Sequence, residues 1–110
     1  MTGKFELKKS KSGQFMFNLK ASNGRVILTS ELYKAKAGAV NGIKSVRKSA
    51  VKDANFEIKS SSKKQPYFVL KASNKEIIGK SEMYTSVVGM KKGIASVKKN
   101  APGAAVDDIA

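Results

Sequence analysis

The sequence contains no cysteine and no histidine. Without cysteine there is no disulfide framework and no thiolate chemistry. Without histidine the chain lacks the commonest general base and the commonest protein ligand for metals. Carboxylates are scarce too, since only 8 of the 110 residues are aspartate or glutamate. We therefore expect a protein that is not an enzyme and has no catalytic residues, no metal site and no cofactor.

Long hydrophobic runs are missing as well. The longest ones, such as Tyr67–Leu70, fall far short of the roughly 20 apolar residues that a membrane-spanning helix needs. The first residues, Met1–Glu6, contain no apolar run of the kind found in signal peptides. We expect a cytoplasmic protein with no membrane partner.

Positive charge is abundant by contrast. The 22 lysines and arginines give the chain a formal net charge of +14. Such a field attracts polyanions whatever the fold. The competing interpretation is a lysine-rich surface that only keeps the protein in solution, because charge alone does not identify a ligand.

The chain repeats itself. Leu19–Asn23 returns as Leu70–Asn74, and Ser30–Tyr33 returns in similar form as Ser81–Tyr84. At this shift of 51 residues, 22 of 46 aligned positions are identical without a gap. One repeat alone, about 50 residues, would bury only about 60% of its extended-chain surface. We expect one domain over residues 1–110, with repeats at about 4–53 and 55–104 sharing a core, followed by a short C-terminal strand or tail.

Each repeat opens with a pattern typical of strands. Apolar and polar residues alternate over Lys4–Lys9, Gln14–Ala21 and Arg25–Thr29, which predicts a three-stranded meander. Asn23-Gly24 indicates a hairpin with a type I′ turn, in which both residues have positive φ. The second repeat has matching strands at 55–59, 67–72 and 77–78.

After Tyr33 the period changes to that of a helix. An apolar stripe is formed by Ala35, Ala39, Ile43, Val46 and Ala50, as expected for an amphipathic helix. A second side of this helix carries small residues, including Gly38 and Gly42, which return as Gly89 and Gly93. Glycine inside a helix costs about 0.8–1 kcal/mol relative to alanine. We call this row of small residues the glycine ridge. Close packing of the ridge against the other repeat's helix, or against the sheet, would explain these glycines. The alternative is that Gly38 and Gly89 lie in a loose first turn of each helix.

The second repeat departs from the first at several points. Thr85 or Ser86 should cap the helix 86–100 better than Lys34-Ala35 caps the first helix. Pro66 replaces Phe15 and predicts an edge or the start of a strand. Lys75 replaces Gly24, so a different or looser turn is expected in the second hairpin. The polar segment Ser60–Lys64 is the predicted most mobile internal segment.

The repeated motifs resemble those of the YegP-like family of small bacterial proteins. The pattern K-A-S-N occurs at Lys20–Asn23, S-E-x-Y at Ser30–Tyr33 and G-x-x-x-G-I-x-S-V-x-K at Gly38–Lys48. The similarity covers nearly the whole chain in two copies. It implies an α+β fold of two pseudo-symmetric β-β-β-α(-β) repeats sharing one antiparallel sheet with two helices packed on it. It also implies that the last strand of each unit is exchanged, so that residues 54–59 end one unit and begin the next and Ala105–Ile109 is a strand. The family has no established activity.

The carboxylates and tyrosines that recur between the copies have structural interpretations. Glu6 with Glu57, and Glu31 with Glu82, could in principle act as acid–base pairs, but each lies among lysines and surface ion pairing is the default. Tyr33 and Tyr84 stand at the strand-to-helix corners. We expect each ring to cover the core while its hydroxyl bonds to the backbone; stacking on a base is the functional alternative.

The basic sides of the two helices are the best candidate for a binding surface. The candidate polyanion-binding residues are Lys36, Lys44, Arg47, Lys48, Lys91, Lys92, Lys98 and Lys99. Such contacts supply salt-dependent affinity without reading sequence. Arginine, which is favoured for contacts to base edges, is scarce, so any binding should have low specificity.

The sequence therefore predicts an uncharacterised non-enzymatic module that binds an acidic partner, nucleic acid first and an acidic protein second, through lysine-rich helix faces. The alternative is a structural or protein-interaction module whose charge is incidental. A small-molecule pocket between the repeats is a third hypothesis. We expect a monomer with internal pseudo-twofold symmetry.

Overall fold

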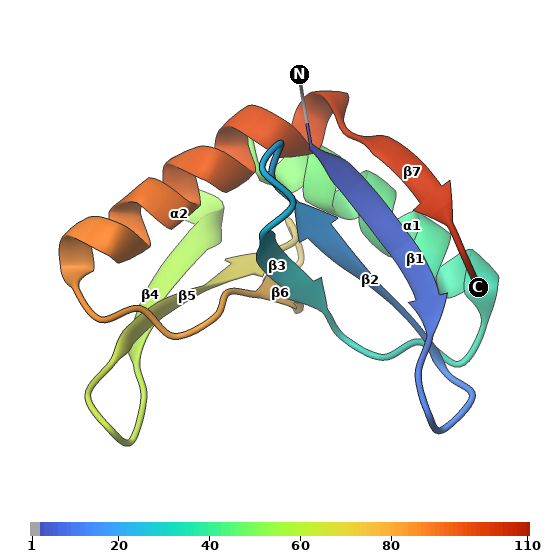
Figure 1. Ribbon diagram of the computed structural model, residues 1–110, viewed down its shortest axis with the longest axis horizontal. Helices are drawn as coiled ribbons and strands as arrows, with labels where there is room; N and C mark the ends of the chain where they lie inside the picture. The colour runs from blue at the N-terminus through green and yellow to red at the C-terminus, as the bar shows by residue number, and fades with distance from the viewer. Residues whose placement is uncertain (1–2) are drawn as a thin grey trace.

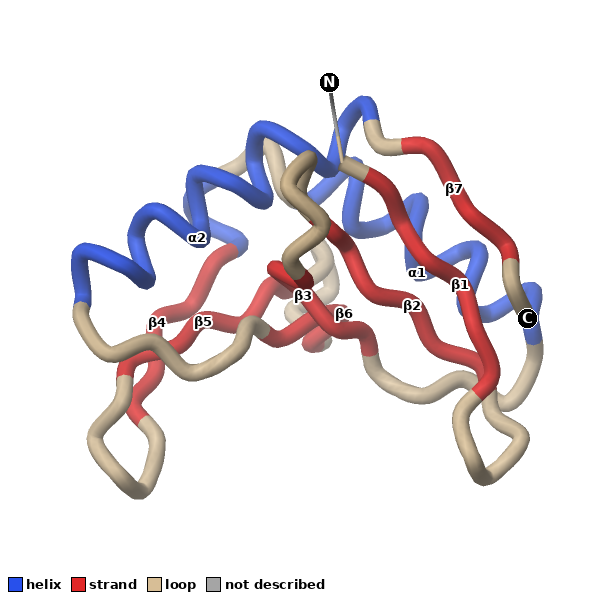
Figure 2. Tube along the Cα trace, viewed as in Figure 1, coloured by secondary structure: helices blue, strands red, loops and turns tan. Residues whose placement is uncertain are grey.

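The computed structural model describes residues 3–110, in which two helices cover one face of a seven-stranded sheet (Figures 1 and 2). The first repeat forms β1 (Lys4–Lys9), β2 (Phe15–Lys20), β3 (Val26–Ser30) and α1 (Lys36–Ser49). The second forms β4 (Phe56–Ser60), β5 (Pro66–Lys71), β6 (Ile77–Lys80) and α2 (Val87–Asn100). The short 3₁₀ helices η1 (Asp53–Asn55) and η2 (Ala101–Gly103) follow the two α-helices, and β7 (Ala105–Asp108) comes last.

The strand order β4-β5-β6-β3-β2-β1-β7 joins the repeats at the centre of the sheet. There β3 and β6, which are counterparts, run antiparallel, and Thr29 lies opposite its own counterpart Lys80. A pseudo-twofold axis therefore passes through this pair. The sequence predicted an antiparallel sheet, and every pairing among the described residues is antiparallel except that of β7 with β1, which is parallel. The sheet is mixed for that reason.

One core serves both repeats. Register places Phe17 opposite Leu7, and Leu19 opposite both Phe5 and Leu28, so these side chains point to the same face of the sheet. The helices cover that face with their apolar stripes. The fully buried side chains come from both copies: Phe5, Phe17, Phe68, Leu7, Leu19, Leu28, Leu70, Met90, Val46 and Val97. This confirms the predicted shared core.

The hairpin turns differ from the prediction. In the 21–24 turn the Gly24 N–H donates to the Ala21 carbonyl, and only Gly24 has a positive φ, of 85°. This is a three-residue loop with a bulge rather than a two-residue type I′ turn. The second repeat keeps the same hydrogen bonds, and Lys75 adopts a φ of 69° in place of Gly24. The prediction that Lys75 gives the second hairpin a different or looser turn was therefore wrong.

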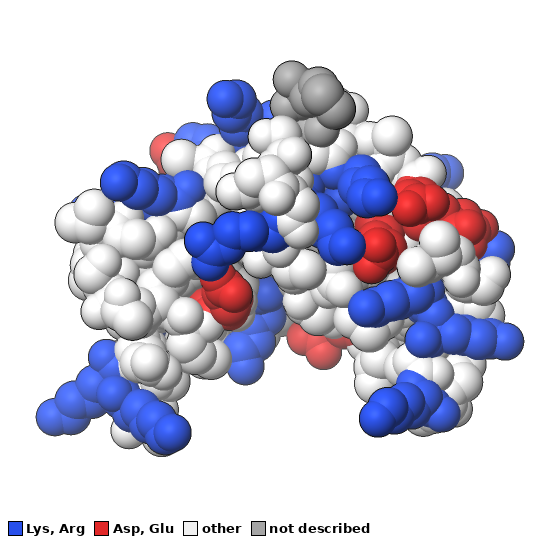
Figure 3. Space-filling model, in the orientation of Figure 1, with Lys and Arg blue, Asp and Glu red and all other residues white. Residues whose placement is uncertain are grey.

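The turn within Ser60–Lys64 is conserved in the same way. Lys64 has a φ of 61°, its N–H donates to the Ser61 carbonyl, and it takes the place of Gly13, whose φ is 82°. Lys63 and Lys64 project from this turn as Lys11 does from the other. The two hairpin turns form the two projections at the bottom of Figure 3. Both projections carry lysines, and the surface is hollowed between them.

Glycine at either left-handed lysine should stabilise the protein. Because the left-handed region is strained for a residue with a Cβ, Lys64→Gly and Lys75→Gly should each raise the free energy of unfolding by about 0.5–1 kcal/mol, after allowing for the greater entropy of an unfolded glycine. Urea unfolding measures the change. Lys63→Gly is the matched control, because Lys63 lacks a positive φ, and it should lose stability. Equal effects of all three substitutions would contradict the argument.

The helix starts follow the prediction. The Ser86 hydroxyl caps α2 by accepting a hydrogen bond from the Gly89 N–H at 3.0 Å, whereas Ala35 provides no side-chain cap for α1. Pro66 is the first residue of β5. Its counterpart Phe15 exchanges two backbone hydrogen bonds with Tyr33, but Pro66 can only accept one, from Tyr84. The interpretation of Pro66 as the start of a strand is confirmed.

The C-terminal residues form a real strand, β7, beside β1 (Figure 1). The Ile109 N–H donates to the Leu7 carbonyl at 2.9 Å. Asp107 forms an ion pair with Lys4 and Asp108 forms one with Lys36. A hydrogen bond from Lys36 lowers the pKa of Asp108 below its ordinary 3.8. The Lys36–Asp108 pair therefore stabilises the folded protein fully at pH values above the ordinary pKa of 3.8. This stabilisation is lost as the pH falls through the lower pKa that Asp108 has in the folded state.

Candidate polyanion-binding surface

Three of the eight predicted binding residues hold the fold together. The Arg47 guanidinium donates to the Ala104 carbonyl and lies 5.5 Å from the centre of the Phe5 ring. Lys36 pairs with Asp108, and Lys98 pairs with Asp53. Because each makes contacts that a ligand would have to break, these three are poor candidates for binding a polyanion. Arg47 in particular fixes the start of β7 to α1.

The other five residues are exposed. They are Lys44 and Lys48 on α1, and Lys91, Lys92 and Lys99 on α2. Within residues 3–110 none of them forms a salt bridge. A charged group with no acidic neighbour is free to meet a phosphate or carboxylate.

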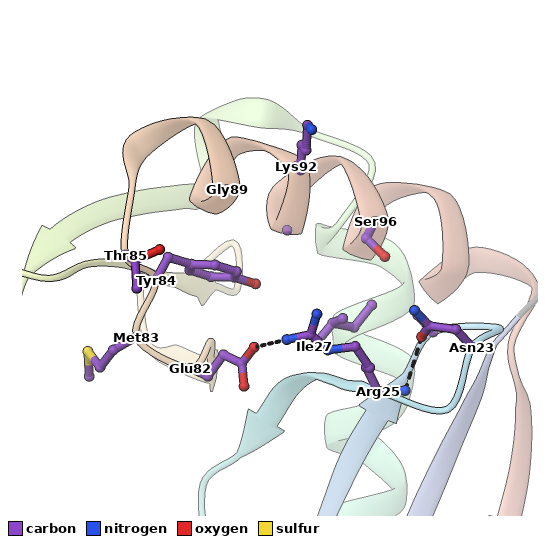
Figure 4. A pocket seen from close by; sticks show the side chains of 12 residues that line it. Asn23, Arg25, Ile27, Glu82, Met83, Tyr84, Thr85, Gly89, Lys92 and Ser96 are labelled. Atoms are coloured by element: carbon purple, nitrogen blue, oxygen red, sulfur yellow. Dashed lines mark hydrogen bonds and ion pairs between the residues drawn. The ribbon is translucent and has the colours of Figure 1, made fainter.

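A hollow of about 450 Å³ lies beside α2, where the helix faces the first repeat's hairpin (Figure 4). The ring of Tyr84 forms part of its wall, and the tyrosine hydroxyl points into it. Arg25, from the hairpin, reaches across to pair with Glu82 at 3.1 Å. Ser96 borders the hollow from the helix, and Lys92 lines its rim with its ammonium directed away from the hollow (Figure 4). The hollow therefore lies between the repeats, as the third sequence hypothesis required, with two cations and one anion around it.

A smaller hollow of about 290 Å³ adjoins the first one along α2. Lys92 and Lys99 line it from the helix, and Ser22 and Asn23 line it from the hairpin. Lys92 and Asn23 belong to both hollows. The lysines of α2 thus border a hollow whose other side carries hydroxyl and amide groups that can also contact phosphate oxygens. We call this combined region the α2 groove, defined by Ala21, Ser22, Asn23, Arg25, Lys92, Ser96 and Lys99.

The counterpart hollow beside α1 has the opposite charge. Its volume is about 430 Å³, and its ionisable lining residues besides Tyr33 are Glu31 and Glu76. Glu76 stands where the α2 groove has Arg25, and Asn41 stands where it has Lys92. The sequence predicted two symmetric basic faces. Of the two hollows beside the helices, only the one beside α2 has cations in its lining, because these two positions have diverged.

The corner tyrosines pack on the core, as the sequence predicted. The Tyr33 ring is stacked near Phe17 with 6.3 Å between ring centres, and Tyr84 has the same relation to Phe68. Burial, and then the neighbouring Glu82, raise the pKa of Tyr84, so its hydroxyl stays protonated at neutral pH. The expected hydroxyl-to-backbone bond is missing from both tyrosines among the described residues. The hydroxyl of Tyr84 can therefore bond to a molecule in the groove.

The glycine ridge packs against the tyrosine of its own repeat and also, as one of the two proposals held, against the sheet, through Phe17 in one copy and Phe68 in the other. A Cβ on Gly42 would lie 2.5 Å from the Tyr33 hydroxyl, and one on Gly93 would lie 2.1 Å from the Tyr84 hydroxyl. The ridge thus accommodates the tyrosine of its own repeat rather than the other helix. Gly38 and Gly89 have less crowded surroundings, so for them the first-turn interpretation is the better one.

Of the recurring carboxylates, Glu6 and Glu57 form ion pairs on the face of the sheet without helices. Glu6 pairs with Lys20 at 3.0 Å, and Glu57 pairs with Lys71. The hydrogen bond from Lys71 lowers the pKa of Glu57. Met16 and Tyr67 lie on this same face, where Lys80 sits 5.1 Å from the centre of the Tyr67 ring. The mixture of charges makes this face a weaker polyanion candidate than the α2 groove.

Residues 3–110 contain no group of three acidic, histidine or cysteine side chains placed to hold a metal ion. In the same range, neither helix has the length and apolar character needed to cross a membrane.

The fold defines a tandem-repeat α+β protein in which two β-β-β-α units complete one sheet. The sequence profile of the family described as "Domain of unknown function (DUF1508)" matches the chain twice, at residues 10–57 and 61–108. The chain belongs to this family, and the resemblance to YegP-like proteins is thereby confirmed.

Its relatives are similar along nearly their whole length. A UPF0339 protein of Pasteurella multocida is 53% identical over 97% of this chain and 94% of its own. The UPF0339 protein YegP of Yersinia pestis is 50% identical over 97% and 96%. The solution NMR structure of yegP from E. coli, titled a protein of unknown function, superposes with a TM-score of 0.94 at 49% identity, covering 99% of this chain and 94% of that one.

Proposed function

We propose that the protein binds an acidic partner, nucleic acid first, through the α2 groove. The observation that carries this proposal is the position of Lys92 and Lys99. Both are exposed, neither has a carboxylate partner within residues 3–110, and both line hollows whose opposite wall carries Ser22 and Asn23. Lysine contacts to phosphate with additional hydroxyl and amide donors position a nucleic-acid backbone without reading bases. In this proposal the chain acts in the cytoplasm as one non-enzymatic domain and as a monomer.

Low specificity follows from the residues in the groove. Arg25 is its only arginine, and Glu82 already occupies it at 3.1 Å. Bidentate arginine contacts to guanine are the commonest specific contacts in DNA recognition. A groove that offers mainly lysine, serine and asparagine should therefore bind through charge, with a strong dependence on salt.

Reversing two charges in the groove should abolish most of the binding. The combined change Lys92→Glu and Lys99→Glu should weaken affinity for a labelled nucleic acid by on the order of tenfold or more, and should lower the slope of log affinity against log salt by about 2. Fluorescence polarisation with single-stranded RNA, duplex RNA and duplex DNA, each at low and near-physiological salt, measures both quantities.

A matched control separates the groove from net charge. Lys44→Glu with Lys48→Glu makes the same change in charge on exposed positions of α1, beside the acidic hollow. It should leave most of the affinity intact. Equal losses in the two variants, with binding that vanishes at physiological salt for all three nucleic acids, would instead favour the alternative of an interaction module whose charge is incidental.

A further inference from the structure

The two repeats place counterpart strands near the two outer edges of the sheet, but only one of these strands is covered by a further strand. β1 and β4 are counterparts, but β1 has a neighbour on each side, β2 and β7, whereas β4 pairs only with β5 within residues 3–110. The segment that follows α1 becomes β4 itself. In the described part of the chain, residues 3–110, no further segment lies beside β4 as β7 lies beside β1. The edge of β4 is therefore free.

Side chains at this edge are correspondingly exposed. Leu7 on β1 is 1% exposed, and its counterpart Ile58 on β4 is 57% exposed. Val87, which begins α2, is 53% exposed. It is the counterpart of Lys36, whose ammonium meets Asp108 at the end of β7.

The backbone of β4 can accept a parallel strand. The Leu7 carbonyl accepts a hydrogen bond from Ile109, so the odd-numbered residues of β1 direct their backbone groups to β7. The counterpart of Leu7 is Ile58, and its N–H and carbonyl face the free edge by the same register. Unpaired edge groups of this kind are the template for addition of a strand from another chain.

The occupied edge shows which side chains a strand at β4 would need. In β7, Val106 lies opposite Phe5, Asp107 opposite Glu6, and Asp108 opposite Leu7. At β4 the position of Asp108 would face Ile58 and Val87, which are apolar, because Val87 replaces Lys36. The position of Asp107 would lie opposite Glu57, the counterpart of Glu6, and near Asn55, the counterpart of Lys4. Lys59 already pairs with Glu57 at 4.0 Å, so within residues 3–110 no cation is left for an acidic residue at this position.

We propose that the free edge of β4 binds an extended segment of a protein partner, parallel to β4, with apolar side chains at the two positions that match Val106 and Asp108 of β7. A second copy of this chain is a poorer occupant, since two chains with a net charge of +14 repel each other. The β7 strand of a second copy would also place Asp108 against Ile58 and Val87 without a lysine to pair with it. This site is separate from the α2 groove, and it does not depend on polyanion binding.

Two synthetic peptides test the proposal. One has the sequence of residues 104–110, and the other carries the Asp108→Val change within that sequence. Titrated into the ¹⁵N-labelled chain, the variant peptide should shift the amide resonances of Phe56–Ser60 and Val87, and should bind about fivefold tighter than the natural sequence, because it buries a valine side chain where the natural peptide buries an unpaired charge. Equal affinities, or shifts that avoid β4, would overturn the proposal.

Variants of the chain locate the site. Ile58→Pro removes a donor that faces the free edge and leaves the β4–β5 hydrogen bonds in place, a change that edge strands tolerate. It should abolish the shifts. Ile58→Glu, which only changes an exposed side chain, should weaken binding at least severalfold even if the proline variant folds poorly. Leu32→Glu, at a position that is 52% exposed, is the control and should bind normally. Sedimentation that shows a dimer joined through β4 would overturn the choice of occupant.

Discussion

Replacing Leu28 with glycine should lower the free energy of unfolding by about 4 kcal/mol, and replacing Gly79 with leucine should lower it by about 2–3 kcal/mol. The two residues are repeat counterparts, and they meet beside the pseudo-twofold axis, where β3 pairs with β6. A Cβ on Gly79 would lie 2.7 Å from both Cγ and Cδ2 of Leu28. Leu28 is 1% exposed, so its side chain has no room to move away.

Making both substitutions together should recover about 2 kcal/mol relative to the sum of the single changes. The double variant still has one leucine and one glycine at the axis, so the total side-chain volume there is unchanged. The second repeat instead of the first then supplies the leucine. A double-mutant cycle with urea unfolding measures this coupling. If the losses simply add, the two positions do not share one space and the pseudo-symmetry at the axis is looser than the contact distances imply.

This pair shows why an internally duplicated chain does not fold into two equal halves. Two leucines cannot occupy the axis, so the counterparts must differ there. The same necessity does not apply at the α2 groove, where Arg25 and Lys92 have become Glu76 and Asn41 in the other repeat. Divergence at exposed positions is not required by packing, which is why the α2 groove is the better place to look for function.

Local patterns in the sequence predicted most of the fold. The repeat, the strands, the two helices and the Ser86 cap all follow from periodicity and short-range chemistry. The hairpin turns did not, because a network of backbone hydrogen bonds in each turn outweighs the strain of a left-handed lysine, which is about 1 kcal/mol. Asn23-Gly24 therefore located the first turn correctly but gave the wrong turn type, and the absence of glycine at Lys75 wrongly predicted a different second turn.

The candidate site could be predicted only in part. The sequence identified the lysines on the helices. It could not show that Arg47 differs from them in having a structural partner, because that partner is the Ala104 carbonyl, 57 residues away. The contrast between the two hollows was present in the aligned repeats. The hollow beside α2 forms only because the first repeat's hairpin lies against the second repeat's helix. A helical wheel contains no information about that contact.

Gly93→Ala should destabilise the protein by about 1–2 kcal/mol, whereas Gly89→Ala in the same helix should stabilise it by about 0.5–1 kcal/mol. Alanine favours the helix equally at both positions. At Gly93, however, the new Cβ would lie 2.1 Å from the Tyr84 hydroxyl and 2.7 Å from Cζ, so the ring would have to leave its place against Phe68. At Gly89 the nearest atom is the Ser86 hydroxyl oxygen, at 3.3 Å.

The sign of the Gly93 effect should reverse when the ring is removed. In a Tyr84→Ala background, Gly93→Ala no longer meets the hydroxyl or the ring, and helix propensity alone should make it stabilising by about 0.5–1 kcal/mol. Urea unfolding of the four chains gives each value. Destabilisation that persists without the ring would assign the clash to Phe68, whose Cε2 would lie 3.2 Å from the new Cβ, and the glycine ridge would then exist for the core rather than for Tyr84.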